Sequence, residues 1–171
     1  MFKENVVFSN VEKVLRIKEN ISILIGKINE SYLFKYLTDA DNDFYEPLSD
    51  RVDLNIFSKK LHELSTTFVI VYKENVAGLI ASYFYDKPSL KGFITLVHIK
   101  QSFRGIHLSD FLVESVKSYA NSISFKYIDL MVYKNNVSAY NLYIKHGFTV
   151  IEEENGRCHM RWNSVLNTFN H

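Results

Sequence analysis

The sequence predicts a mixed α/β (α+β) fold, with a mostly antiparallel central sheet that carries helices on both faces. Apolar, β-branched and aromatic segments follow one another directly between residues 66 and 99, which is typical of antiparallel strands joined by tight turns. A predicted helix then separates a strand at 94–99 from a strand at 127–132. Such a crossover places these two strands parallel in one sheet.

Length and composition predict one globular domain over residues 1–171. Apolar residues make up 47% of the chain and charged residues 23%, and the net charge of +1 argues against nucleic acid or an anionic membrane as a partner. Cys158 is the single cysteine, so no disulfide framework is expected. The first residues lack the apolar core of a signal peptide, and we expect a cytoplasmic protein.

The N-terminal part of the chain is the hardest to assign. Residues 11–18 fit either a short helix or an edge strand, and periodicity does not assign the apolar run 21–25. A helix is predicted over 30–38, followed by an acidic loop. Asp53 is expected to cap a second helix with one apolar face.

The rest of the chain alternates strand-like and helix-like patterns with clear turn signals. Gly147 is expected to end the last helix, and Asn155-Gly156 is a typical hairpin turn. The predicted elements are strands 66–72 and 76–85 around a Glu74-Asn75 turn, strand 94–99, helix 108–121, strand 127–132, helix 136–146, and strands 148–153 and 158–162.

The stretch from Ile94 to Asp110 links a strand, a loop and a helix N-terminus. The loop contains Arg104 and Gly105, and apolar residues then recur at helical spacing. The first N–H groups of a helix have no partner within the helix, and the helix dipole favours an anion beside them. The stretch therefore predicts a phosphate-binding loop.

Two blocks of the sequence resemble the GNAT superfamily of acyl-coenzyme-A-dependent N-acetyltransferases. IKQSFRGIHLS at 99–109 is similar to the family's strand–loop–helix with its R/Q-x-x-G-x-G/A signature. NNVSAYNLYIKHGF at 135–148 is similar to N-x-x-A-x-x-L-Y-x-x-x-G-F. The resemblance implies a GNAT-like fold, with a variable helical region beside the acceptor over 1–65 and a sheet with the cofactor-binding core over 66–163.

The resemblance also implies acetyl-CoA as co-substrate, held in a cleft between two splayed strands. Backbone N–H groups of the loop would receive the pyrophosphate, while the strand before it would pair with the pantetheine arm. His107 stands where the family has Gly, and we expect this position to be already helical and to keep its N–H. The implied cofactor-binding residues are Val97, His98, Ile99, Arg104, Gly105, Ile106, His107, Leu108, Ser109, Asp110, Asn136 and Tyr143.

For catalysis, the resemblance assigns Tyr143 as the general acid, since a phenol is protonated at neutral pH and can protonate a leaving thiolate. Tyr143 also shares an apolar helix face with Leu142 and Ala139, so a core role is the alternative. His98 is the candidate base, because an unperturbed imidazole titrates near neutrality. A packed sheet histidine and proton loss to solvent are the other readings.

The implied activity is transfer of an acetyl group to a primary amine of a small molecule, with an amino-sugar nucleotide as one possible acceptor. A non-catalytic acyl-CoA-binding or interaction domain is the alternative. The acidic loop at 39–43 is expected to border the acceptor and to attract a cationic amine. It lacks the Gly and Glu of a calcium loop, so we expect no metal. A monomer or a homodimer fits equally well.

Overall fold

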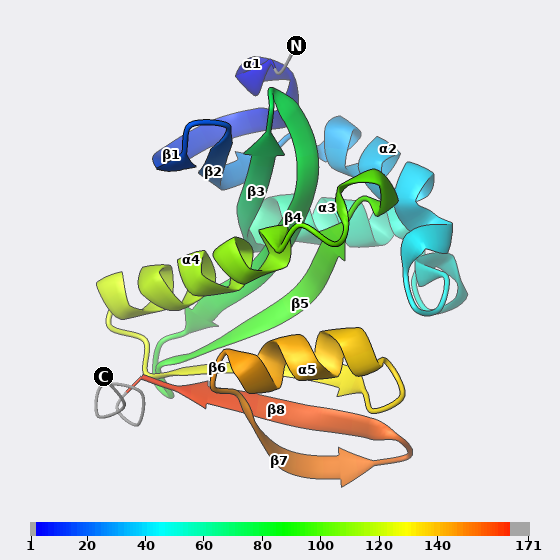
Figure 1. Ribbon diagram of the computed structural model, residues 1–171, viewed down its shortest axis with the longest axis vertical. Helices are drawn as coiled ribbons and strands as arrows, with labels where there is room; N and C mark the ends of the chain where they lie inside the picture. The colour runs from blue at the N-terminus through cyan, green and yellow to red at the C-terminus, as the bar shows by residue number, and fades with distance from the viewer. Residues whose placement is uncertain (1–2, 165–171) are drawn as a thin grey trace.

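The computed structural model describes residues 3–164, and the ends of the predicted domain, 1–2 and 165–171, lie outside the described part. One eight-stranded sheet, in the order β1-β2-β3-β4-β5-β6-β8-β7, forms the centre of the molecule (Figure 1). All neighbouring strands are antiparallel except β5 and β6, which are parallel as predicted. The strands are β1 (Phe8–Lys18), β2 (Ile21–Ile28), β3 (Thr66–Tyr72), β4 (Asn75–Asp86), β5 (Lys91–Ile99), β6 (Tyr127–Tyr133), β7 (Thr149–Glu154) and β8 (Arg157–Asn163).

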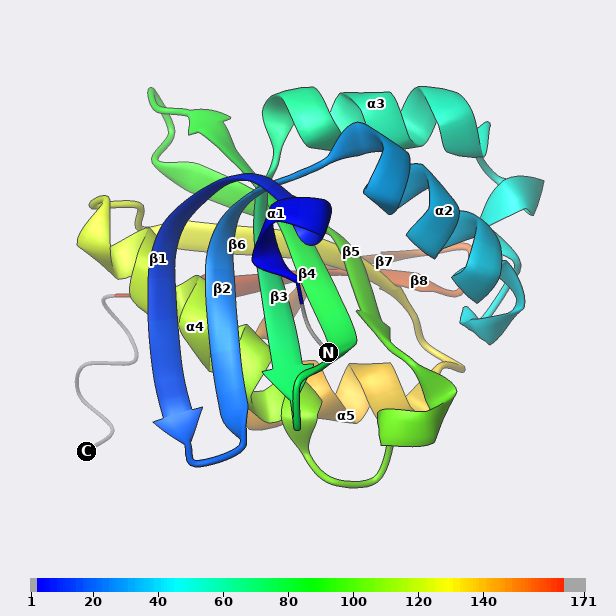
Figure 2. The same ribbon diagram turned by 90° about the horizontal axis from the view of Figure 1, so that it is seen from above.

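Helices cover both faces of this sheet, as the fold prediction requires (Figure 2). Helices α2 (Glu30–Ala40) and α3 (Leu54–Leu64) lie on one face, and α4 (Leu108–Ser122) and α5 (Val137–Lys145) on the other. The remaining helical elements are short: α1 (Glu4–Val7) and the 3₁₀ turns η1 (Asp41–Asp43), η2 (Leu48–Asp50) and η3 (Gln101–Phe103).

Each face of the sheet has its own hydrophobic core, because strand side chains alternate between the two faces. Leu112 and Val116 of α4 are fully buried against Phe68 and Ile80 of the sheet. On the other face, Leu37 of α2 packs in a second cluster with strand residues from β2 to β5. Burying one such leucine contributes roughly 1.5–3 kcal/mol.

The structure corrects the helical assignment of residues 1–65. The segments that periodicity left open form the antiparallel hairpin β1–β2, so strands as well as helices precede residue 66. Strand β1 is the edge of the sheet, and its register against β2 shifts at three places, which breaks the period of two. Strand β2 is buried on both faces and therefore shows no alternation.

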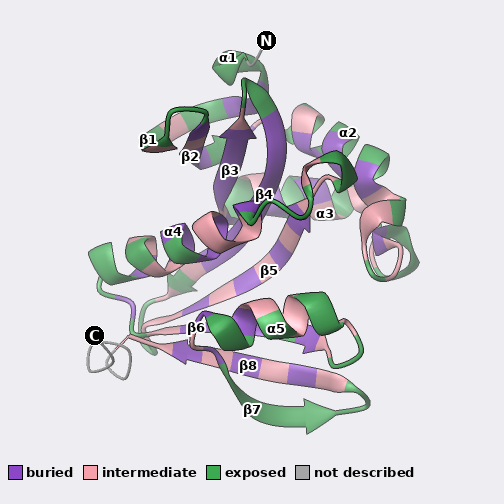
Figure 3. Cartoon of the chain, viewed as in Figure 1, coloured by how far each residue is buried: buried purple, intermediate pink, exposed green. Residues whose placement is uncertain are grey.

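The turns follow the prediction closely, with one shift. Strands β3 and β4 turn through Lys73 and Glu74, both with positive φ (47° and 61°), one residue earlier than the predicted Glu74-Asn75. Asn155 and Gly156 form the predicted turn between β7 and β8. The C-terminal order differs from chain order, since β8 lies between β6 and β7 and the exposed strand β7 is the edge (Figure 3).

Candidate active site

The site begins where the parallel strands β5 and β6 separate. Their pairing ends at Ile94 and Leu130, and beyond this point β6 pairs only with β8 (Figure 1). A bulge lies at the same place, because Ser82 and Ala81 of β4 pair with Ile94 and Leu96 and leave Thr95 without a counterpart. A bulge bends its strand and increases the local twist, so Thr95 turns the end of β5 away from β6.

The end of β5 consequently has one unpaired backbone edge. The Lys100 N–H donates to the Ala77 carbonyl across the β4 side, at 2.9 Å. Backbone N–H and C=O groups of successive residues point to opposite sides of a strand. Those of Val97 and Ile99 therefore point away from β4, toward the place where β6 has separated from β5. The Ile99 carbonyl accepts a hydrogen bond from Arg104 Nε at 3.0 Å, which confirms this direction. An extended chain can pair with this edge as an added strand.

The loop before α4 offers a row of free N–H groups. Within residues 3–164, none of the backbone N–H groups from Gly105 to Ser109 donates to another protein group. The next N–H group along the chain, that of Asp110, is not free, since it donates to the His107 carbonyl at 3.2 Å. Five successive free N–H groups at a helix N-terminus form a site for phosphate oxygens.

His107 departs from the expected helical conformation. It is the N-cap of α4 and is left-handed, with φ 61° and ψ 25°. Glycine adopts this region without strain, which explains why the family pattern has Gly here. The His107 side chain lies outside the loop at the surface, with Nδ1 3.2 Å from Asp110 Oδ2.

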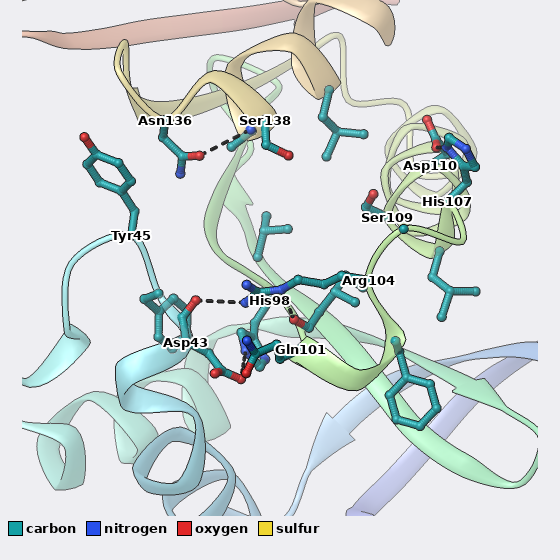
Figure 4. A pocket seen from close by; sticks show the side chains of 18 of the residues that line it. Asp43, Tyr45, His98, Gln101, Arg104, His107, Ser109, Asp110, Asn136 and Ser138 are labelled. Atoms are coloured by element: carbon teal, nitrogen blue, oxygen red, sulfur yellow. Dashed lines mark hydrogen bonds and ion pairs between the residues drawn. The ribbon is translucent and has the colours of Figure 1, made fainter.

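A cleft of about 810 Å³ lies against this loop, and we call it the loop cleft (Figure 4). Ten of the twelve predicted cofactor residues line it, and only Ile106 and Tyr143 do not. Ile106 still contributes a free N–H. The wall consists of Asn42, Asp43, Phe44, Tyr45, Val97, His98, Ile99, Gln101, Phe103, Arg104, Gly105, His107, Leu108, Ser109, Asp110, Asn136, Ser138, Ala139, Asn141, Leu142 and Lys145.

A second cleft of about 420 Å³, the splay cleft, passes between β5 and β6. Its wall includes Leu130 from one face of the sheet and Met131 from the other, and six of its residues also line the loop cleft. A molecule in one cleft can therefore reach a molecule in the other. The splay cleft is lined by Phe44, Tyr45, Glu46, Leu48, Arg51, Val52, Phe57, Phe93, Ile94, Thr95, Leu96, Val97, Leu130, Met131, Val132, Tyr133, Asn136, Ala139, Leu142, Tyr143 and Arg157.

Tyr143 lies in the wall of the splay cleft, on α5 and close to the unpaired end of β5. Its ring packs on Phe148 at 5.7 Å between centroids, and burial raises the pKa of its phenol above the ordinary value. The hydroxyl has no hydrogen-bond partner among the described residues. The packed ring agrees with the core role, and the assignment of Tyr143 as general acid stays a prediction.

His98 is buried in the wall of the loop cleft, and its ring is already engaged. Nδ1 lies 2.7 Å from the Tyr36 hydroxyl, and Nε2 lies 3.4 Å from Asp43 Oδ2. Burial lowers the pKa of His98 to about 4, although the Asp43 carboxylate opposes this shift. A hydroxyl thus contacts Nδ1, while Nε2 faces a carboxylate and has no hydrogen-bond partner within the described residues. Its predicted role as base therefore stays a prediction.

Arg104 and Asn136 connect the parts of the site. The Arg104 guanidinium spans the loop cleft from the Ile99 carbonyl to the Asp43 carbonyl, the latter at 2.8 Å (Figure 4). Asn136 caps α5, since its Oδ1 accepts from the Ala139 N–H at 3.4 Å. Asn136 also lines both clefts, so the cap and the predicted cofactor contact occupy one position.

The acidic loop borders the site but does not make it acidic. Asp39 pairs with Lys35, Asp41 accepts from the Ser49 N–H and hydroxyl, and Asp43 faces His98. None of these three carboxylates lines the splay cleft. Asp43 does line the loop cleft, and the expected attraction of a cationic amine by this loop stays a prediction. The charged residues that do line the splay cleft are Glu46 and Arg51, five residues apart, and Arg157 from the distant strand β8.

No three His, Cys, Asp or Glu side chains gather as a metal site anywhere in residues 3–164. In the same part of the chain, no helix has the length and apolar character needed to cross a membrane.

The acetyltransferase (GNAT) family model matches residues 31–148, which is more than half of the chain. A GNAT acetyltransferase from Streptococcus pneumoniae superposes with a TM-score of 0.64 at 18% identity, covering 82% of this chain and 98% of that one. A spermidine N-acetyltransferase chimera from Vibrio cholerae and hSSAT gives 0.69 at 15%, with coverages of 87% and 99%.

An N-acetyltransferase from Thermoplasma acidophilum, solved with coenzyme A, gives a TM-score of 0.63 at 12% identity, with coverages of 82% and 98%. No curated protein matches the sequence. These structural likenesses agree with the fold, and the family model covers both clefts' central elements. The chain therefore belongs to the acetyltransferase (GNAT) family and is an acyltransferase.

Proposed function

We propose that this protein transfers an acetyl group from acetyl-CoA to a primary amine of a small molecule. The observation that carries the proposal is one continuous path: five free N–H groups, an unpaired strand edge, and a buried tyrosine beside it. The free N–H groups of 105–109 fit a pyrophosphate, and the edge at Val97 and Ile99 fits the amides of a pantetheine arm.

Acetyl-CoA supplies a thioester whose carbonyl carbon accepts an amine. The acceptor enters the splay cleft, and its neutral nitrogen bonds to that carbon as the carbon–sulfur bond breaks. A backbone N–H of the β5 edge stabilises the charge on the carbonyl oxygen. Tyr143 gives its phenolic proton to the leaving thiolate and regains one from the amide nitrogen through solvent. The reaction yields an N-acetyl amide and free coenzyme A.

Loss of the ammonium proton is the step for which we keep two proposals. His98 would act as base through whichever ring nitrogen is unprotonated, Nδ1 beside the Tyr36 hydroxyl or Nε2 beside Asp43. The alternative is release of the proton to water in the open clefts. An amino-sugar nucleotide remains one proposed acceptor, with its amine in the splay cleft.

A direct test is incubation with acetyl-CoA and a panel of amines, comparing the wild type with Tyr143→Phe. Removing a general acid lowers kcat by roughly 10²–10⁴-fold while leaving KM for acetyl-CoA similar. Thiol release and acetylated product are measured together. A protein that is stabilised by coenzyme A but acetylates no amine, with unchanged thiol release in Tyr143→Phe, would instead be the non-catalytic binding domain.

A further inference from the structure

The splay cleft has an excess of positive charge. Its charged wall residues are one carboxylate, Glu46, and two guanidinium groups, Arg51 and Arg157. Glu46 lies between η1 and η2, Arg51 directly follows η2, and Arg157 is the first residue of β8. The fold thus brings two arginines to the wall of the cleft that admits the acceptor.

Neither arginine is neutralised by the protein. Within the described residues, no carboxylate lies within ion-pair distance of Arg51 or Arg157. The Arg157 guanidinium lies over the Tyr133 ring at 5.2 Å, and its Nε is buried without a hydrogen-bond partner. The carboxylate of Glu46 is engaged by the Tyr133 hydroxyl. A buried polar N–H without a partner costs free energy, which an incoming acceptor would recover.

Strand β8 provides an internal comparison. Arg161 lies on the same face of β8 as Arg157, and it is held by Asp129 through Nε and a terminal nitrogen, both at 2.7 Å. Asp129 also accepts from His159 Nε2 at 2.8 Å. A structural arginine on this face therefore has a buried carboxylate of its own. Arg157, at the cleft, has none.

We infer that the acceptor amine also carries an anionic group, a phosphate or a carboxylate, which Arg51 and Arg157 bind in the splay cleft. The guanidinium fork matches either anion with paired N–H···O bonds, and the aromatic wall of Tyr45 and Tyr133 lowers the competing hydration. The inference rests on the proposed function, since it names the class of amine. It adds an anionic group to the primary amine that the proposed function assigns.

Matched amine pairs test the inference: glucosamine against glucosamine 6-phosphate, and serine against serinamide, with spermidine as a cationic comparison. We expect the wild type to prefer the anionic member of at least one pair in kcat/KM by about ten- to a hundredfold, the effect of one or two charge-assisted hydrogen bonds. The phosphate pair and the carboxylate pair distinguish the two anions.

The variants Arg157→Gln and Arg51→Gln should lose this preference through a higher KM for the anionic amine, with little change for its neutral partner. Arg157→Lys keeps the charge and should retain part of the preference, because a lysine lacks the fork. Arg16→Gln is the matched control, since Arg16 is exposed on β1 at the far edge of the sheet.

Calorimetric titration of the same pairs in the presence of coenzyme A gives a readout that does not depend on turnover. If no pair shows an anionic preference in binding or turnover, or if the preference survives in the double glutamine variant, the inference is wrong. Equal acetylation of neutral and anionic amines would contradict the inference but agree with the proposed function. Absence of acetyl transfer to every amine, with anion binding intact, would overturn the proposed function alone.

Discussion

His107 is the residue at which this chain departs most clearly from the family signature. Its backbone is left-handed, with φ 61°, at the cap of the helix whose N–H groups face the loop cleft. The side chain is largely exposed, so it does not obstruct the five free N–H groups. His107 thus preserves the geometry that glycine would supply, at the expense of backbone strain.

This strain predicts the order of two variants. His107→Gly should be more stable than His107→Ala by about 1 kcal/mol, because both lose the side chain but only glycine is relaxed at positive φ. Denaturant unfolding of the two variants measures the difference. Equal stabilities, or a more stable alanine variant, would mean that residue 107 does not have a left-handed backbone conformation in solution.

A substitution at His98 separates its two roles. If His98 packs and positions η1 through Asp43, His98→Gln should lower stability by about 1–3 kcal/mol, since the Tyr36 hydroxyl loses its buried hydrogen-bond partner. The pH profile of kcat would keep its shape. If His98 is the base, kcat should fall at least a hundredfold and the acidic limb of the profile should change.

At the scale of elements, a buried histidine joins the end of α5 to the first turns of α4. His146, the residue after α5, lies 2.6 Å through Nδ1 from Glu114 and 2.7 Å through Nε2 from Asp110, both on α4. These carboxylates raise the pKa of His146 above 6.5, and the same contacts lower the pKa of Glu114 to about 2. The cluster therefore holds Tyr143 and the phosphate loop in a fixed relation.

The stability of this cluster should depend on pH in a defined sense. The contribution of His146 is complete below its unfolded pKa of 6.5 and is lost as pH rises through its raised folded pKa. The contribution of Glu114 is lost as pH falls from 4.5 toward 2. His146→Gln should therefore cost most, about 2 kcal/mol, between pH 4.5 and 6.5, and less at pH 9.

Lys145→Gln provides the matched control, because Lys145 contacts the same Asp110 oxygen at 2.7 Å from an exposed position. The Lys145 ion pair is exposed to solvent, so the effect of Lys145→Gln should be small from pH 5 to 9. Thermal unfolding across pH distinguishes the two variants. A His146→Gln penalty that grows toward pH 9 would contradict the charged cluster.

At the scale of the whole molecule, coenzyme A should stabilise the native state. Coenzyme A at a hundred times its Kd raises the free energy of unfolding by about 2.7 kcal/mol. For a domain of this size, that raises Tm by roughly 5–10 °C. Pantetheine lacks the pyrophosphate, so at equal concentration it should stabilise far less. Differential scanning fluorimetry checks both ligands. Equal shifts would show that the 105–109 loop is not the phosphate site.

The predicted and observed elements agree where local interactions dominate. Asp53 caps α3 through Oδ1 and the Ile56 N–H at 2.9 Å, and Gly147 follows α5 with φ 83°, both as predicted. Residues 11–18 and 21–25 were left unassigned, because tertiary packing and not a local hydrophobic pattern determines their strands. Strand β1 is an irregular edge and strand β2 is buried on both faces, so neither shows the alternation that identifies a strand.

The sequence by itself determined the family and the order of strands and helices around the 105–109 loop, because these are encoded in contiguous residues. Only the tertiary structure decided what lines the splay cleft. Arg51 and Arg157 are more than a hundred residues apart, and the partners of His98 come from α2 and η1. Such contacts depend on chain packing across the sheet, for which a single sequence contains no periodic signal.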